Sequence, residues 1–400
     1  MLKDLKQSHF IDFFSFAIIV SMVFSPYTLT LSMIGLAAAG VFSFTPSLRP
    51  GIRWQALKAL LTPWRQPAFF VMVLFFLITL IGAWDIQDAW YFKARLRVKL
   101  PYLLLPLLFI VLPPFSPRRR NTYLLFLLCL ITATSIGVLI NYGLNAEEIN
   151  ELIRKGKPMP TPRNHIRYSL LVVMGIIAGG YLTVERFKWR FKAEHYWIKG
   201  MTVFLFIFLH ILSVKTGLVV MYTTMLFIVF RYLLFSRFYK LAIAAIVVMI
   251  ALPIIAYQTV PSFRSKMMYT RHDLNMFSQG EGEIYGDSGR IISLQVGWDI
   301  FREHPWLGVG AGNFKKAVEA KFGSDEIDYW ETLMPHNQLL FTAAATGIVG
   351  LLLFLYAFFY PLFYKRRYKS FLIATFHVMI ACLANVRYDN FAAITNTQFN

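Results

Sequence analysis

The residues best placed to do chemistry lie in one long polar segment, residues 258–335, and at its junction with the next apolar stretch. The segment interrupts an otherwise apolar chain, and it holds 11 of the 21 acidic residues together with Arg290. His336 follows at the start of the next apolar stretch. A neutral imidazole can take a proton from an attacking hydroxyl, and a helix N-terminus favours the neutral form. His336 is a candidate base, but its spacing alone favours a boundary histidine that caps or solvates the helix.

Further cations lie near the predicted outer ends of the apolar stretches. They are Arg95, Arg97 and Lys99 before one stretch, Arg163, His165 and Arg167 before another, and Lys215 in a tight turn between two. Guanidinium groups bind phosphate oxygens in pairs, and cations at a low-dielectric boundary can stabilise a departing diphosphate without a metal. The alternative is snorkelling of these side chains toward lipid head groups. For Arg290 we favour the phosphate-binding interpretation.

Two other patterns do not support a site. The glycine-rich run 308–312 lacks the GxGxxG spacing of a phosphate-binding loop. Asp325, Glu326 and Asp328 have no histidine at ligand spacing, so a solvated acidic face is the better interpretation. We therefore predict neither a metal site nor a cofactor. No Asp-x-Asp pair is placed to hold a nucleotide-sugar through a metal.

Composition places these residues in a membrane protein. Of 400 residues, 57% are hydrophobic and 15% charged, whereas a soluble domain has about 25% charged residues. The first apolar stretch has no small-residue cleavage site after it, so we expect a retained span. The net charge of +19 gathers at the ends of apolar stretches, which favours membrane lipids over nucleic acid as partners. Cys129 and Cys382 lie inside apolar stretches and are expected to pack as small hydrophobic residues.

The apolar stretches predict an all-α polytopic membrane helix bundle of about 11–12 spans with one long outward lid loop. They fall at about 10–25, 27–44, 68–84, 100–115, 121–142, 167–184, 200–214, 217–235, 241–257, 337–360 and 371–386. We divide the chain into an N-terminal transmembrane bundle (1–257), the lid loop (258–335) and C-terminal transmembrane helices (336–400). Within the lid, Ile291–Arg302 has helical spacing and ends at His304-Pro305.

Basic clusters determine the expected orientation. With the N-terminus in the cytoplasm, every short loop of dense positive charge lies inside. These clusters are at residues 49–65, 118–120, 186–199, 231–240 and 365–369. The outward segments are then 85–99, 143–167, 214–217 and the lid loop.

Three segments of the lid region point to a known family by their order, spacing and membrane setting. They are Ser288-Gly289-Arg290, His304-Pro305-Trp306-Leu307-Gly308-Val309-Gly310-Ala311-Gly312-Asn313-Phe314, and Pro335-His336-Asn337. Together they resemble the signature loop of bacterial O-antigen ligases and the related O-antigen polymerases. Supporting matches are Lys99-Leu100-Pro101 with Leu105-Pro106, Asn164-His165-Ile166-Arg167-Tyr168, and Val214-Lys215-Thr216-Gly217. The likeness covers most of the chain, but only the lid loop is specific.

The resemblance implies a metal-independent, inverting glycosyltransferase of the GT-C type in the bacterial inner membrane, with its active site facing the periplasm. Members take a glycan from undecaprenyl diphosphate; ligases transfer it to a sugar hydroxyl of the lipid A core, and polymerases to another repeat unit. By this likeness His336 would be the base or would orient the acceptor. Arg290 and Lys215 would hold the diphosphate, and Arg97, Lys99, Arg167 and His165 are further candidates.

The chain departs from the family pattern at two places. The family usually has an arginine where this chain has Lys215, and a lysine lacks the bidentate fork. The family also usually ends in a further span and a cytoplasmic tail, whereas residues 387–400 here are polar.

We expect the ligase, with the polymerase as the alternative within the same chemistry. A transporter or flippase for lipid-linked sugars is the alternative of a different class, since cation-lined outward cavities would also serve it. A transporter should have ionisable residues near the bilayer midplane or broken helices in matching halves. His210 lies inside a span, but its Leu and Phe neighbours favour a packed, hydrogen-bonded histidine.

Overall fold

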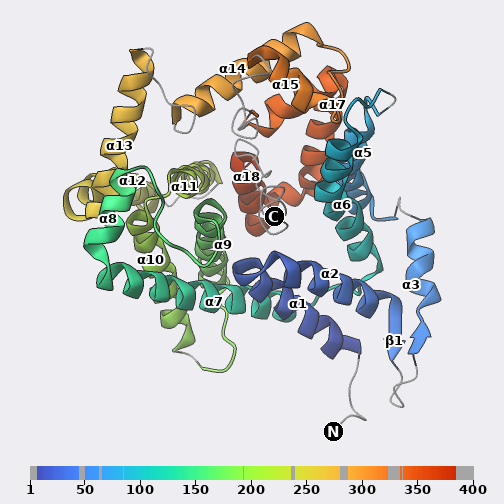
Figure 1. The fold of residues 1–400 in the computed structure, drawn as a ribbon. Helices are drawn as coiled ribbons and strands as arrows, with labels where there is room; N and C mark the ends of the chain where they lie inside the picture. The colour runs from blue at the N-terminus through green and yellow to red at the C-terminus, as the bar shows by residue number, and fades with distance from the viewer. Residues whose placement is uncertain are drawn as a thin grey trace. The chain divides into compact units, whose positions relative to one another are not determined.

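The structure, a computed structural model, describes residues 7–44, 50–62, 65–83, 85–191, 193–235, 239–279, 287–322, 334–335 and 337–383. These residues are almost all helical, which confirms the predicted all-α class (Figure 1). A short antiparallel ladder joins β1 (Phe42–Phe44) to β2 (Pro50–Ile52), with Ser43 opposite Gly51. The chain forms two compact units. The predicted three-part division at 257 and 335 stays a prediction.

The first unit comprises residues 1–57, 111–269 and 370–379. Its helices are α1 (Gln7–Phe24), α2 (Pro26–Val41), α3 (Trp54–Lys58), α7 (Pro117–Leu144), α8 (Ala146–Arg154), α9 (His165–Val184), α10 (Glu194–Leu212), α11 (Lys215–Phe235), α12 (Tyr239–Thr259), the start of α13 (Pro261–Ser278) and most of α18 (Phe371–Leu383). The most buried of these is α9, which packs against α7, α10 and α11. Glycines permit the close packing: a Cβ added at Gly175 would lie 2.9 Å from a methyl carbon of Leu205.

The second unit comprises residues 58–110, 270–369 and 380–400. Its elements are η2 (Ala59–Leu61), α4 (Pro67–Phe70), η4 (Val71–Val73), α5 (Leu74–Leu77), η5 (Ile78–Leu80), α6 (Ala89–Val111), the end of α13, α14 (Asp287–Glu303), α15 (Phe314–Phe322), α17 (Gln338–Phe363), η6 (Tyr364–Lys369) and the end of α18. In Figure 1, α14 and α15 lie at one end of α17. A buried core joins them, including Ile300, Phe314, Phe341 and Ala344.

Local sequence explains where several helices begin. Ser25 and Ser116 are N-caps, and each is followed by a proline at the first helical position, where a missing N–H costs nothing. Asn164 and Asn337 cap α9 and α17 with their side-chain oxygens. These four caps place the helix starts directly after polar residues that flank apolar stretches.

The described helices account for all eleven apolar stretches of the sequence. Six of them are long and apolar enough to cross a membrane: α1, α7, α9, α10, the Ala242–Thr259 part of α12, and the Gln338–Arg367 region that contains α17. Shorter apolar helical segments lie at Pro26–Val41, Pro67–Leu80 and Leu372–Ala381. Residues 67–80 alternate between α and 3₁₀ turns rather than forming one continuous helix. The chain is a multi-pass membrane protein.

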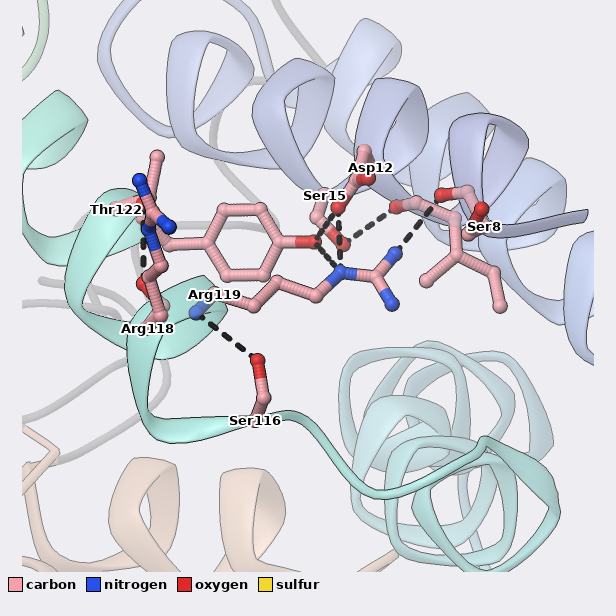
Figure 2. Close-up of polar contacts among 9 residues, drawn as sticks. Ser8, Asp12, Ser15, Ser116, Arg118, Arg119 and Thr122 are labelled. Carbon is pink, nitrogen blue, oxygen red and sulfur yellow. Dashed lines mark hydrogen bonds and ion pairs between the residues drawn. The ribbon is translucent and has the colours of Figure 1, made fainter. Parts of the chain in front are cut away.

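A polar cluster joins α1 to the start of α7 (Figure 2). The Nε of Arg119 lies 2.5 Å from Oδ1 of Asp12, and its Nη2 donates to the carbonyl of Ser8 at 2.8 Å. The hydroxyl of Tyr123 donates to the same carboxylate oxygen. Arg119 belongs to the basic run 118–120 at the start of α7. Its ion pair with Asp12 therefore links α7 to α1.

Candidate functional site

Two helices of the first unit begin with cationic or imidazole side chains. α9 starts at His165 with Arg167 in its first turn, and α11 starts at Lys215; all three side chains are half-buried. The helices approach closely, since a Cβ added at Gly217 would lie 2.6 Å from Cβ of Ser169. Neither first turn contains an acidic residue. Because the positive end of a helix dipole lies at its N-terminus, these charges oppose the dipoles, and a bound anion would relieve the conflict.

Buried hydroxyl groups fix the turn that carries Lys215. Ser213 has a left-handed backbone with φ of 57°, and its Oγ donates to the carbonyl of His210 at 3.0 Å. Ser262, at the start of α13, donates to the carbonyl of Ile211 at 2.7 Å. Lys215 therefore follows a turn that is tied to two neighbouring helices.

His210 is packed and hydrogen-bonded, as its neighbours in the sequence predicted. Its Nδ1 lies 2.9 Å from the carbonyl oxygen of Phe206, and its Nε2 lies 2.6 Å from the hydroxyl of Tyr222. A carbonyl only accepts hydrogen bonds, so Nδ1 carries the hydrogen and Tyr222 donates to Nε2. Both ring nitrogens are satisfied within the protein, which agrees with a structural role.

Arg290 lies in the first part of α14 in the second unit. Its side chain is exposed, whereas the preceding residues Ser288 and Gly289 are buried. Ser293 donates its hydroxyl to the carbonyl of Arg290 at 2.7 Å. α14 spans the predicted helix Ile291–Arg302 and ends before His304-Pro305, as the sequence predicted. The start of α14 thus has two buried residues followed by the exposed side chain of Arg290.

His336 lies outside the described residues, but residues on both sides of it are fixed. Met334 is 0% exposed, and its sulfur accepts a hydrogen bond from the hydroxyl of Tyr91 at 3.6 Å. Pro335 packs against α14, where a Cβ at Gly297 would lie 2.4 Å from the proline ring. Asn337 caps α17: its Oδ1 accepts from the backbone N–H groups of Leu339 and Leu340 in the first turn, at 2.9 and 3.0 Å.

The cations of α6 differ in their surroundings. Arg95 is 6% exposed, and its guanidinium carbon lies 4.6 Å from the ring centroid of Phe341 in α17. Lys99 is half-buried, with its Nζ 5.4 Å from the ring of Tyr102, while Arg97 is exposed. Arg95 therefore serves packing near the start of α17, and Arg97 and Lys99 remain candidates for ligand binding.

The glycine-rich segment joins a break in α17 instead of forming a phosphate loop. α17 is interrupted at Gly347, whose φ is 66° and ψ −169°. The backbone N–H groups of Val309 and Gly310 donate to the carbonyls of Ala344 and Ala345, at 3.2 and 2.9 Å. In return the N–H of Ile348 donates to the carbonyl of residue 305 at 2.8 Å. The segment thus satisfies backbone groups that the break exposes inside a membrane span.

Asn313 joins the same segment to the loop before α6. Its Nδ2 donates to the carbonyl of Asp85 at 2.5 Å, and its Oδ1 accepts from the N–H of Gln87 at 2.8 Å. Gly310 also touches Gly82, because a Cβ added at Gly82 would lie 2.6 Å from Cα of Gly310. The motif 304–314 therefore ties two distant parts of the second unit together.

The predicted site residues are divided between the two units. His165, Arg167 and Lys215 belong to the first, and Arg97, Lys99 and Arg290 to the second. Their convergence around His336 stays a prediction. Among the residues that the structure describes, no cluster of His, Cys, Asp and Glu side chains could hold a metal ion. Residues 325, 326 and 328 lie outside that part of the chain.

Sequence reasoning gave no role to three residues that shape this region: Asp273, which contacts the start of α14, Asn313 and Gly347. Gly347 had only a weak signal, since a glycine inside a helical pattern is tolerated at a cost in helix stability. Asn313 lies inside the motif but has no spacing that reveals its partners. Nothing in the local sequence connects Asp273 to Ser288.

Comparison with known proteins agrees with the resemblance found in the sequence. Residues 200–355 match the sequence model of a family described as O-antigen ligase. The matched stretch runs from α10 into α17 and includes Lys215, Arg290 and His336. A search of curated proteins finds no match to the chain. Over residues 200–355, the chain is therefore similar to the O-antigen ligase family.

Proposed function

We propose that the protein is an O-antigen ligase that transfers a glycan from undecaprenyl diphosphate to a sugar hydroxyl of the lipid A core. The family match supports a membrane glycosyltransferase of the ligase or polymerase kind. The reaction would take place at the periplasmic face of the inner membrane, without a metal ion and with inversion at the anomeric carbon. The identity of the donor, the identity of the acceptor and the periplasmic location of the reaction all belong to this proposal.

In the proposed reaction, one displacement occurs at the anomeric carbon. The acceptor hydroxyl oxygen forms the new glycosidic bond, and its proton moves to His336. The bond between the anomeric carbon and the phosphate oxygen breaks, and its electron pair leaves with undecaprenyl diphosphate. Lys215 and Arg290 would stabilise the negative charge that develops on the leaving group. His165, Arg167, Arg97 and Lys99 are further proposed contacts of the diphosphate.

The observation that carries this proposal is the position of cations at helix N-termini inside or beside the matched stretch. Lys215 begins α11, and His165 and Arg167 begin α9. A cation in the first turn opposes the helix dipole by about 0.3–1 kcal/mol when exposed. A diphosphate at these helix starts would interact favourably with the cations and with the positive end of each helix dipole. An anionic ligand therefore fits both helix starts.

A polymerase would use the same chemistry with another repeat unit as acceptor. A transporter remains the alternative of a different class, and the break in α17 is the feature that favours it. However, residues 305–310 bond to the broken ends of α17. Transporters use such breaks to bind substrate with free backbone groups. Because several backbone groups at this break are already bonded to protein, the break gives less support to a transporter.

The test is transfer by the purified protein in liposomes that contain the lipid-linked glycan and purified lipid A core. We expect product on the core lipid, and His336→Ala should lower its rate by about 10²–10⁴-fold, the range typical of a lost general base. His304→Ala is the matched control, because His304 is an exposed histidine of the same unit and should leave the rate unchanged.

Other outcomes separate the alternatives. Growth of glycan chains without core lipid would identify a polymerase, and movement of the donor across the membrane without product would identify a transporter. Full activity of His336→Ala would remove the base assignment. A chelator such as EDTA should not change the rate, and its inhibition would contradict the metal-independent reaction.

A further inference from the structure

A buried carboxylate joins the end of α13 to the start of α14. Asp273 is 6% exposed, and its Oδ1 accepts the hydroxyl of Ser288 at 3.0 Å. Its Oδ2 accepts the backbone N–H of Ser288 at 3.2 Å. Ser288 itself is 0% exposed. The link bridges 15 positions of sequence and holds the two helix ends together.

The link is strong enough to set the position of the helix start. A buried carboxylate is costly unless charge-assisted hydrogen bonds satisfy it, and such bonds are roughly twice as strong as neutral ones. A negative charge at a helix N-terminus also interacts favourably with the dipole. Because one carboxylate accepts from both the backbone N–H and the hydroxyl of Ser288, the link restrains the first turn of α14.

Arg290 is two residues beyond this link, on the same turn. Its side chain is exposed while Ser288 and Gly289 are buried. Further along α14, Gly297 packs against Pro335, the residue before His336. α14 is therefore held at its start by Asp273 and in its middle by the chain that leads into α17. The helix therefore carries Arg290, the proposed diphosphate contact, and packs against Pro335.

We propose that Asp273 is a positioning residue for the lipid diphosphate donor, acting through Ser288 to hold Arg290 where it contacts the diphosphate. This inference rests on the proposed function, in which Arg290 binds the donor. Asp273 acts on the backbone that carries the guanidinium and does not touch substrate. Loss of the link should therefore weaken donor binding without changing acceptor binding.

The test compares Asp273→Ala, Ser288→Ala, Arg290→Ala and the double variant Asp273→Ala/Arg290→Ala in the liposome assay, with donor and acceptor titrated separately. We expect Asp273→Ala to raise the KM for donor about tenfold or more, since a displacement of about 1 Å in a positioning group has large effects. The KM for acceptor should not change. In the Arg290→Ala background, Asp273→Ala should add no further loss. Asp299→Ala, at an exposed carboxylate on the same helix, should leave both KM values unchanged.

Each result decides between the two claims. If Arg290→Ala raises the donor KM but Asp273→Ala does not, or if the two losses multiply in the double variant, the positioning role is wrong and the role of Arg290 stands. If Arg290→Ala leaves the donor KM unchanged, both the role of Arg290 and this inference are wrong. Should Asp273→Ala fail to fold, Ser288→Ala decides, because it removes one of the two bonds and keeps the backbone N–H. A donor KM unchanged in Ser288→Ala then contradicts the inference.

Discussion

At the scale of single residues, burial and contacts separate structural cations from candidate ligand-binding ones. Arg163 precedes α9, and its Nη1 donates to the carbonyl of Met22 at 2.6 Å, near the end of α1. Burial lowers the pKa of Arg163. A half-buried guanidinium that bonds to a helix end is one of the ways by which the last carbonyls of a helix are satisfied. The same residue type is exposed at position 290.

We therefore predict opposite effects for the two arginines. Arg163→Ala should lower the thermal unfolding midpoint, because the carbonyl of Met22 loses the guanidinium that donates to it, a loss of about 1–3 kcal/mol in the free energy of unfolding. Arg290→Ala should change the free energy of unfolding by no more than about 0.5 kcal/mol, as is usual for exposed positions. It should also raise the KM for donor. Thermal unfolding in detergent and donor titration measure the two effects. A stable Arg163→Ala protein with weakened donor binding would reverse the assignment.

At the scale of elements, the break in α17 depends on one glycine. Gly347 has a positive φ that side chains rarely adopt, and an added Cβ would lie 2.0 Å from the carbonyl oxygen of Trp306. That neighbour is backbone, so it cannot move aside without losing the bonds between residues 305–310 and α17. The break in α17 and the glycine-rich segment 308–312 therefore depend on each other.

Gly347→Ala should therefore destabilise the protein by about 3 kcal/mol or more, or prevent folding, as expected for strain combined with a backbone clash. Gly137→Ala is the matched control: Gly137 lies inside α7, and an added Cβ there meets nothing within 4 Å. That change should be neutral or stabilising by up to about 1 kcal/mol. The yield of monodisperse protein and its unfolding midpoint measure both. Equal behaviour of the two variants would show that the break is not required.

The elements that the sequence predicts well are those with a local signal. All eleven apolar stretches coincide with helical segments, because hydrophobic length is a local property. The end of α14 at His304-Pro305 is equally local. The bonds from residues 309–310 to α17, the link from Asp273 to Ser288 and the contact of Arg95 with Phe341 are not predictable in this way. They join residues far apart in the chain, and spacing carries no information about such pairs.

The candidate site shows the same division. The residue types at 215, 290 and 336 indicated phosphate binding and proton transfer, and all three fall in the matched stretch. The sequence could not distinguish the exposed Arg290 from the buried Arg95 and the half-buried Arg163, whose contacts lie on other helices. Burial depends on tertiary packing, which one sequence does not reveal at a single position.

At the scale of the whole molecule, the matched stretch 200–355 crosses from the first unit into the second. Lys215 lies on one side of that division and Arg290 on the other. The proposed reaction needs a donor and an acceptor that reach the protein from the same side of the membrane. The proposed function therefore requires that the starts of α9 and α11 face the periplasm.

The distribution of basic clusters predicts that orientation, and cysteine labelling tests it. In a background with Cys129→Ala and Cys382→Ala, Lys157→Cys and Lys188→Cys place single thiols at two exposed positions. Lys157 lies between α8 and α9 on the predicted periplasmic side, and Lys188 lies between α9 and α10 on the predicted cytoplasmic side. A membrane-impermeant maleimide added to cells with a permeabilised outer membrane should label only the first. Because one span, α9, separates the two positions, labelling should exchange after inside-out vesicles are prepared. Labelling of position 188 from the periplasm would place the starts of α9 and α11 in the cytoplasm, away from a periplasmic donor, and would contradict the proposed reaction.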